Sequence, residues 1–283
     1  MCMSAGLRTL QDVFEKGKKQ LEFDRANTAE TCFFPFPLIK GKLYSIVGAS
    51  NKGKTWFSLA TAISLAREGH KVGYVSTEET EADIAENLEV INDKAVFERV
   101  KFGFTTELTE KGFRDALELL VEEGVEVIVL DYLRPDILSE HSGDLNTTMG
   151  KLYRVLRQFL NDNSACVIQT IQANATLYKK DFDEMLKANP DQVNVMIDGG
   201  YTTYKRSHGV AFIRNKYVNG EVKYWLYVSK GKGHKIRDTI LYKNIPYGID
   251  ITTFSIRYGK PYEDNAGNAG NNYAAKVIKK GIG

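Results

Sequence analysis

The stretch "GASNKGKT" runs from Gly48 to Thr55 and decides the fold. Two glycines frame four small or polar residues, and a lysine and a hydroxyl residue follow, which is the pattern G-x-x-x-x-G-K-[ST]. The β-rich run "KLYSIV" at 42–47 precedes it, and a helical pattern that ends in glycine follows it at 53–69. A strand before and a helix after favour a phosphate-binding loop over a flexible surface turn.

This loop predicts a nucleotide site that uses ATP and Mg²⁺. Its backbone N–H groups and the amino end of the new helix are expected to point at phosphate. Lys54 should reach the β- and γ-phosphates, and Thr55 should bind Mg²⁺. The predicted phosphate-binding residues are Gly48, Ala49, Ser50, Asn51, Lys52, Gly53, Lys54 and Thr55.

Strands and helices alternate on the carboxyl side of this loop. Apolar, β-rich runs predict strands at 71–76, 99–104, 125–133 and 165–173, and helical spacing predicts helices at 81–91, 109–124 and 146–162. Such alternation is typical of an α/β fold, with a mostly parallel, twisted sheet and helices on both faces.

The pattern changes after residue 207, where β-rich runs follow one another without a helix. Two of these runs are joined by Asn219-Gly220, the strongest short-range signal for a hairpin. Further strands are predicted at 239–244 and 252–259. We therefore expect antiparallel strands to extend one edge of the parallel sheet.

Composition excludes several classes of protein. The chain is 43% hydrophobic with a net charge of +2 and has no apolar run long enough to span a membrane. Its start, "MCMSAGLRTL", lacks the features of a secretion signal. The three cysteines are scattered, which argues against a disulfide framework or a zinc site and fits the cytoplasm.

Four polar side chains lie at or just after the carboxyl ends of the predicted strands, the edge where ligands of open α/β sheets bind. Asp131 ends the apolar stretch "VEVIVLD" and would hold Mg²⁺ through water, or else cap a turn. Glu78 and Glu79 follow the strand at 71–76, where one of them would orient the attacking water, or both would begin a helix. Gln172 would sense the γ-phosphate, or be an ordinary polar strand end.

Taken in order, these residues resemble the RecA-like ATPases, most closely the DnaB-type helicase core, with KaiC-like ATPases nearby. "GASNKGKT" resembles the Walker A motif and "VIVLDYL" the Walker B motif. "STEET" looks like the glutamate motif, which implies Glu78 as catalytic base and Glu79 as a second acid. "CVIQTIQAN" is similar to the strand that carries the sensor, implying that role for Gln172.

The resemblance also implies assembly into a ring, a hexamer in this family, with ATP hydrolysed between subunits. "VSKGKGHK" resembles the hairpin that reaches a neighbour's γ-phosphate, which places trans-acting cations at Lys230 and Lys232. Two positions depart from the pattern. Lys232 stands where arginine is usual and lacks its bidentate fork, and Ile171 replaces a serine before the sensor.

The predicted organisation is one motor domain with two short flanks. An amino-terminal arm at 1–34 holds an amphipathic helix at 7–20, which would pack either on the adjacent subunit or on its own chain. The RecA-like ATPase domain covers 35–259. The Gly/Asn-rich tail at 260–283 is expected to be disordered.

The motor is expected to move along single-stranded DNA and to bind it without sequence specificity. In such a ring the segments 134–150 and 174–206 would face inward. Interleaved cations and tyrosines suit phosphates and stacked bases, although a solvated polar loop has the same composition. The predicted nucleic-acid-binding residues are Lys179, Lys180, Lys187, Lys205 and Arg206.

These expectations lead to a DNA helicase or translocase, with replication proteins as possible partners. Two alternatives stay open. One is a KaiC-like signalling or assembly ATPase that binds proteins, and the other is a RecA-type recombinase that forms a filament. DNA should stimulate hydrolysis by a motor and have no effect on a KaiC-like ATPase. A recombinase would catalyse strand exchange, whereas a helicase would displace a strand.

Overall fold

The structure is a computed structural model that describes residues 11, 15, 18–19, 28–29, 35–49, 52–89, 91, 93–104, 109–133, 145–173, 200–231, 243–250 and 252–260. Residues 11, 15, 18 and 19 are helical, in line with the helix predicted at 7–20. Apart from Lys260, the tail predicted at 260–283 lies outside the described residues.

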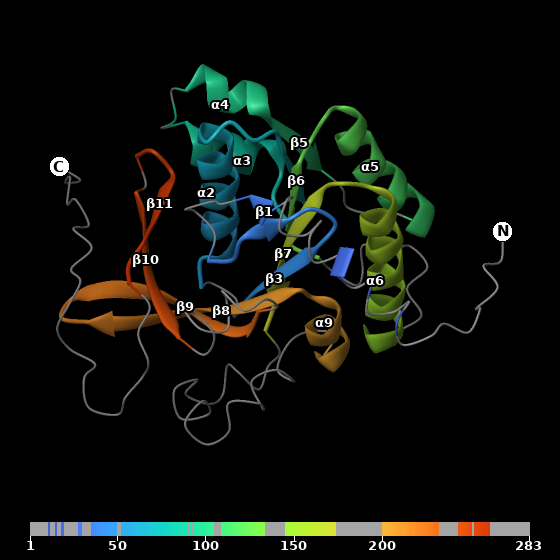
Figure 1. Ribbon diagram of the computed structural model, residues 1–283. Coiled ribbons are helices and arrows are strands. Elements are labelled where there is room, and N and C mark those ends of the chain that lie inside the picture. Colours follow the sequence, from blue (N-terminus) through green and yellow to red (C-terminus); the bar gives the residue numbers. More distant parts are fainter. Residues whose placement is uncertain are drawn as a thin grey trace.

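A parallel sheet forms the centre of the fold, as predicted (Figure 1). Apart from the edge strand β5, its strands are almost fully buried and mainly apolar, which is expected when helices cover both faces. They run in the order β3, β7, β6, β4 and β5 across the sheet. Their bounds are β3 (Leu43–Gly48), β4 (Val72–Ser76), β5 (Val100–Phe104), β6 (Val127–Asp131) and β7 (Cys166–Gln172).

Four further strands extend the β3 edge. β8 (Gly209–Val218) pairs parallel with β3, and β9 (Glu221–Gly231) returns antiparallel to β8. Asn219 and Gly220 both have positive φ, 53° and 83°, which confirms the predicted hairpin turn. β10 (Asn244–Asp250) and β11 (Ser255–Tyr258) complete the antiparallel edge. Of the strand expected at 239–244, residues 239–242 lie outside the described residues, and Asn244 is the first residue of β10.

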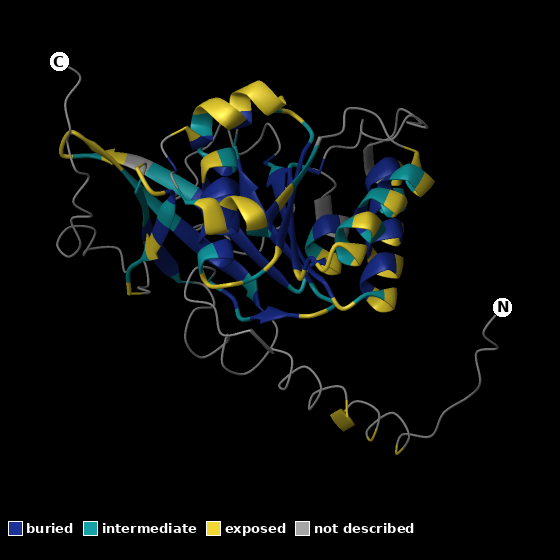
Figure 2. Ribbon diagram, turned by 90° about the horizontal axis from the view of Figure 1, so that it is seen from above, coloured by how far each residue is buried: buried dark blue, intermediate teal, exposed yellow. Residues whose placement is uncertain are grey.

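Helices cover the two faces of this sheet separately. α2 (Lys54–Arg67), α3 (Glu81–Leu88) and α4 (Lys94–Arg99) share one apolar cluster with β3 and β4. α5 (Glu110–Glu122) and α6 (Leu145–Asp162) share the other. Figure 2 shows the buried strands between helices whose outer faces are exposed. The predicted α/β class, with a RecA-like layered core, is confirmed.

Three local features differ from the sequence predictions. The helix expected at 81–91 is α3 alone, and a separate α4 begins after Asp93, whose side chain accepts from the N–H of Val96 at 3.3 Å. The expected loop at 174–206 ends in a helix, α9 (Gly200–Arg206). Two short strands, β1 (Thr28–Ala29) and β2 (Leu38–Ile39), pair antiparallel. No helix among the described residues is long and apolar enough to cross a membrane.

Candidate nucleotide site

The loop between β3 and α2 has the backbone that its glycines predict. Gly48 ends the strand, and Gly53 caps the helix with φ 80° and ψ 30°, a left-handed conformation that favours glycine. Lys54 is the first helical residue, so its side chain starts where the helix presents its unpaired N–H groups. Ser50 and Asn51 lie outside the described residues.

The Lys54 side chain folds back along this loop and is only 9% exposed. Its Nζ donates to the Ala49 carbonyl oxygen at 3.2 Å and to Gln172 Oε1 at 2.8 Å. A Cβ at position 48 would lie 2.8 Å from Lys54 Cγ, so only glycine leaves room for the lysine. β3 and β7 pair in register at Gly48 and Gln172, which brings the predicted sensor beside the loop.

Asp131 ends β6 and is only 4% exposed. Its Oδ2 accepts from the hydroxyl of Tyr74, and its Oδ1 from the hydroxyl of Thr170, both at 2.6 Å. The Tyr74 hydroxyl also lies 3.0 Å from Ser58 Oγ of α2. Burial, and then the nearby Asp131 carboxylate, raise the pKa of Tyr74 well above its usual range, so this hydroxyl stays a donor.

Tyr74 and Thr170 were not singled out in the sequence. The only available signal was a polar atom inside the otherwise apolar runs "VGYVS" and "CVIQTIQ". Their partner is contributed by a different strand, so the pairing itself has no local signature. They fix the orientation of the Asp131 carboxylate from two sides.

The residues present fit Mg²⁺ bound with a nucleotide. The described part of the chain contains no group of three His, Cys, Asp or Glu side chains that would hold a metal by themselves. Mg²⁺ instead favours one or two protein oxygens together with substrate phosphates and water. Asp131 has accepting capacity left after its two hydrogen bonds, and Thr55 follows the loop lysine.

The two glutamates after β4 differ in their surroundings. The Thr77 N–H donates to the Asp131 carbonyl oxygen at 3.0 Å, which fixes this segment at the end of β6. Glu78 is exposed, whereas Glu79 is half-buried. Burial raises the pKa of Glu79, and the Asp131, Asp83 and Glu78 carboxylates add to the shift. The Asp131 carboxylate is thus one of the groups that disfavour the charged form of Glu79.

The predicted trans-acting lysine is held within its own chain. Lys230 Nζ donates to the carbonyl oxygens of Tyr204, in a short contact, and of Lys205, at 3.2 Å. It also lies 4.8 Å from the centroid of the Tyr204 ring. Lys230 therefore binds the carboxyl end of α9, where carbonyl oxygens attract cations. Lys232 lies outside the described residues.

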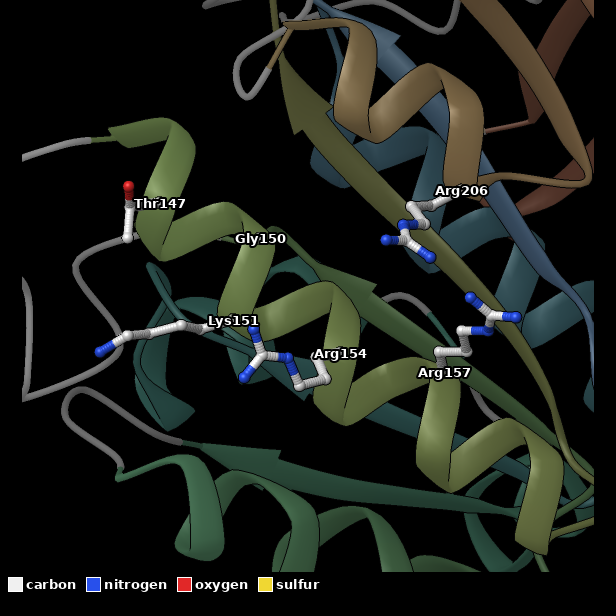
Figure 3. Close-up of a pocket in the computed structure, with 6 residues that line it drawn as sticks. All are labelled: Thr147, Gly150, Lys151, Arg154, Arg157 and Arg206. Atoms are coloured by element: carbon white, nitrogen blue, oxygen red, sulfur yellow. The ribbon is translucent and has the colours of Figure 1, made fainter. Parts of the chain in front are cut away.

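Of the predicted nucleic-acid-binding residues, Lys205 and Arg206 are described, and both are exposed on α9. Lys179, Lys180 and Lys187 lie outside the described residues. A hollow of about 640 Å³ opens between α9 and α6 (Figure 3). Three of its cations were not predicted, although Lys151, Arg154 and Arg157 recur every three residues along the helix. The hollow is lined by Thr147, Gly150, Lys151, Arg154, Arg157 and Arg206.

Comparison with known proteins supports the fold assignment. No family model and no curated protein matches the sequence. Many solved structures match, among them the crystal structure of a KaiC-like protein from the hyperthermophilic archaeon Pyrococcus horikoshii. It is 18% identical, with a TM-score of 0.57, and the match covers 79% of this chain and 91% of that chain. The chain therefore has a RecA-like fold of the kind seen in that KaiC-like protein.

Proposed function

We propose that this protein is a Mg²⁺-dependent ATP hydrolase that assembles head to tail, as the six-membered ring that its motifs resemble, and moves along single-stranded DNA. One observation supports the hydrolase part of the proposal. The buried Lys54 Nζ donates to Gln172 Oε1 at 2.8 Å, at the carboxyl edge of the sheet where Asp131 also lies. A buried cation held by neutral oxygens at a helix amino end is prepared for an anionic ligand.

Each residue then has a defined task. Lys54 and the loop N–H groups bind the β- and γ-phosphates, and Asp131 and Thr55 hold the cation, which neutralises charge that develops on the phosphates. A γ-phosphate that accepts from Lys54 competes with Gln172 for the same ammonium. Occupancy of the site is thereby transmitted to Gln172 and to the chain that follows β7.

Glu78 and Glu79 are the two candidates for the residue that orients water. A base works best when its pKa approaches the working pH, and the raised pKa of Glu79 favours this residue on physical grounds. The family resemblance favours Glu78. Comparing Glu78→Gln with Glu79→Gln decides between them, because the variant that removes the base should bind ATP and fail to turn it over.

A second function has its own support. The matched crystal structure is of a KaiC-like protein, and the adjacent acids after β4 suit that comparison equally. In this alternative the ATPase cycle would drive protein assembly or signalling, and DNA would have no effect on hydrolysis.

The test is steady-state ATP hydrolysis with and without single-stranded DNA, combined with a mass measurement of the assembly. We expect DNA to stimulate hydrolysis and the particle to be larger than one chain. Lys54→Ala should abolish hydrolysis and keep the fold, and serves as the control for contaminating ATPases. Hydrolysis that is indifferent to DNA would support the protein-assembly function, and absence of hydrolysis would refute both.

A further inference from the structure

The hollow between α6 and α9 has an excess of positive charge that the residues described by the structure do not neutralise. Lys151 has an acidic neighbour, Glu110, at 3.9 Å. By contrast, Arg154, Arg157 and Arg206 are exposed and make no ion pair or hydrogen bond with any residue that the structure describes. Figure 3 shows Arg157 and Arg206 pointing toward each other from the two helices. Two facing guanidinium groups repel unless an anionic group lies between them.

The opposite imbalance occurs at α3. Positions 78–89 hold no lysine or arginine. The exposed carboxylates without an ion pair or hydrogen bond to another described residue are Glu78, Glu81, Glu86 and Glu89. Burial is the main cause of the raised pKa of Glu79, and the neighbouring carboxylates raise it further, in line with this crowding of negative charge.

One chain cannot bring these two surfaces together. α3 packs with α2 on one face of the sheet, whereas α6 packs with α5 on the other (Figure 1). Opposite charges on opposite faces can meet only between molecules, in a head-to-tail contact. Such a contact closes into a ring or continues as a filament.

We propose that the α6–α9 hollow receives the acidic α3 segment of a second copy of this chain. The proposal rests on the assembly proposed above and names the surfaces that form it. It also accounts for the position of Lys230. Because Lys230 binds the carboxyl end of α9, docking α9 against a neighbour's α3 carries this lysine toward the Glu78–Glu79 edge of that neighbour's nucleotide site.

A charge-swap experiment tests this contact. One variant reverses the hollow, Arg154→Glu with Arg157→Glu, and another reverses the acidic segment, Glu81→Arg with Glu86→Arg. All four side chains are exposed, so both variants should fold. Lys40→Glu with Lys71→Glu is the matched control, since these exposed lysines flank the amino ends of β3 and β4, at the opposite edge of the sheet.

Sedimentation with ATP should show each reversed variant dissociating at least about 100-fold more readily than the parent, because like charges would face each other. An equimolar mixture of the two should assemble again, because each hollow then meets a segment of opposite charge. The control should assemble like the parent.

Three results would overturn the inference: a reversed variant that assembles normally, a mixture that stays dissociated, or a hollow variant that assembles but loses binding to single-stranded DNA. The last would make the hollow a nucleic-acid surface. A parent chain that stays monomeric would refute both the proposed assembly and this contact. A parent that assembles without hydrolysing ATP would refute the proposed function alone.

Discussion

Replacing Tyr74 with phenylalanine isolates one hydroxyl at the centre of the site. The ring is fully buried and packs against Phe102 at a centroid distance of 5.3 Å, and both features persist in the variant. What disappears is the 2.6 Å hydrogen bond to Asp131 Oδ2 and the contact with Ser58. Asp131 keeps the hydrogen bond from Thr170.

The expected loss follows from the charge of the acceptor. A hydrogen bond to a charged group contributes about 1.5–3 kcal/mol, and a neutral one about 1 kcal/mol. Because Thr170 still serves the carboxylate, we expect Tyr74→Phe to lower the free energy of unfolding by about 2 kcal/mol. For a domain of this size, that lowers the melting temperature by roughly 4–8 °C.

Tyr153→Phe is the matched control in urea unfolding followed by circular dichroism. Tyr153 is equally buried, but its hydroxyl bonds only neutral groups, the Gln169 amide at 2.9 Å and the Thr203 side chain, so about 1 kcal/mol should be lost for each bond and no charged partner is affected. The Mg²⁺ concentration for half-maximal hydrolysis should rise about tenfold or more in Tyr74→Phe and stay unchanged in Tyr153→Phe. An unchanged Mg²⁺ requirement in Tyr74→Phe would refute the idea that Tyr74 orients a metal-binding carboxylate.

Three further predictions concern single side chains. Gly48→Ala places a Cβ 2.8 Å from Lys54 Cγ, so hydrolysis should fall about 100-fold with an unchanged circular dichroism spectrum, and near-parental rates would contradict the geometry. Gly150→Ala lies inside α6 with no atom within 4 Å of the new Cβ, and should raise the free energy of unfolding by about 0.5–1 kcal/mol in the same urea assay. Because the pKa of Glu79 is raised on folding, the parent loses stability as the pH rises from the ordinary carboxyl pKa to the raised one. Glu79→Gln should therefore be more stable than the parent at about pH 7 and lose this advantage at about pH 4, and an equal difference at both would contradict it.

The sequence predicted those parts of the fold whose cause is local. β3 and β6 are continuous buried runs, and the hairpin turn depends on two adjacent residues that accept positive φ. α4 was missed because six residues with mixed charges make less than two helical turns, too few for a clear period. α9 was not predicted either, because its seven residues also make less than two helical turns.

The site divides in the same way. The phosphate loop was predictable because its motif, strand and helix are contiguous. The network around Asp131 was not, because Tyr74 and Thr170 lie 57 and 39 residues from it along the chain. The order of strands in the sheet decides which polar atoms meet. The sequence shows that strands and helices alternate along the chain, but it does not show which strands are neighbours in the sheet. The hollow between α6 and α9 also depends on tertiary packing, although the three-residue spacing of its cations was visible.

Two of the lysines to which phosphate contacts were assigned, Lys54 and Lys230, are held by oxygens of one stretch of chain. Lys54 donates to Gln172, where β7 ends, and Lys230 donates to the last carbonyl oxygens of α9, where the same stretch turns into β8. Phosphate at Lys54 competes with the first contact, and a role for Lys230 at a neighbour's phosphate requires release of the second. In the proposed assembly, nucleotide in one subunit and contact with the next subunit would therefore act on opposite ends of residues 172–206. The same stretch contains every cation that the sequence predicted to touch DNA. ATP hydrolysis between subunits and binding of single-stranded DNA would therefore be coupled through it.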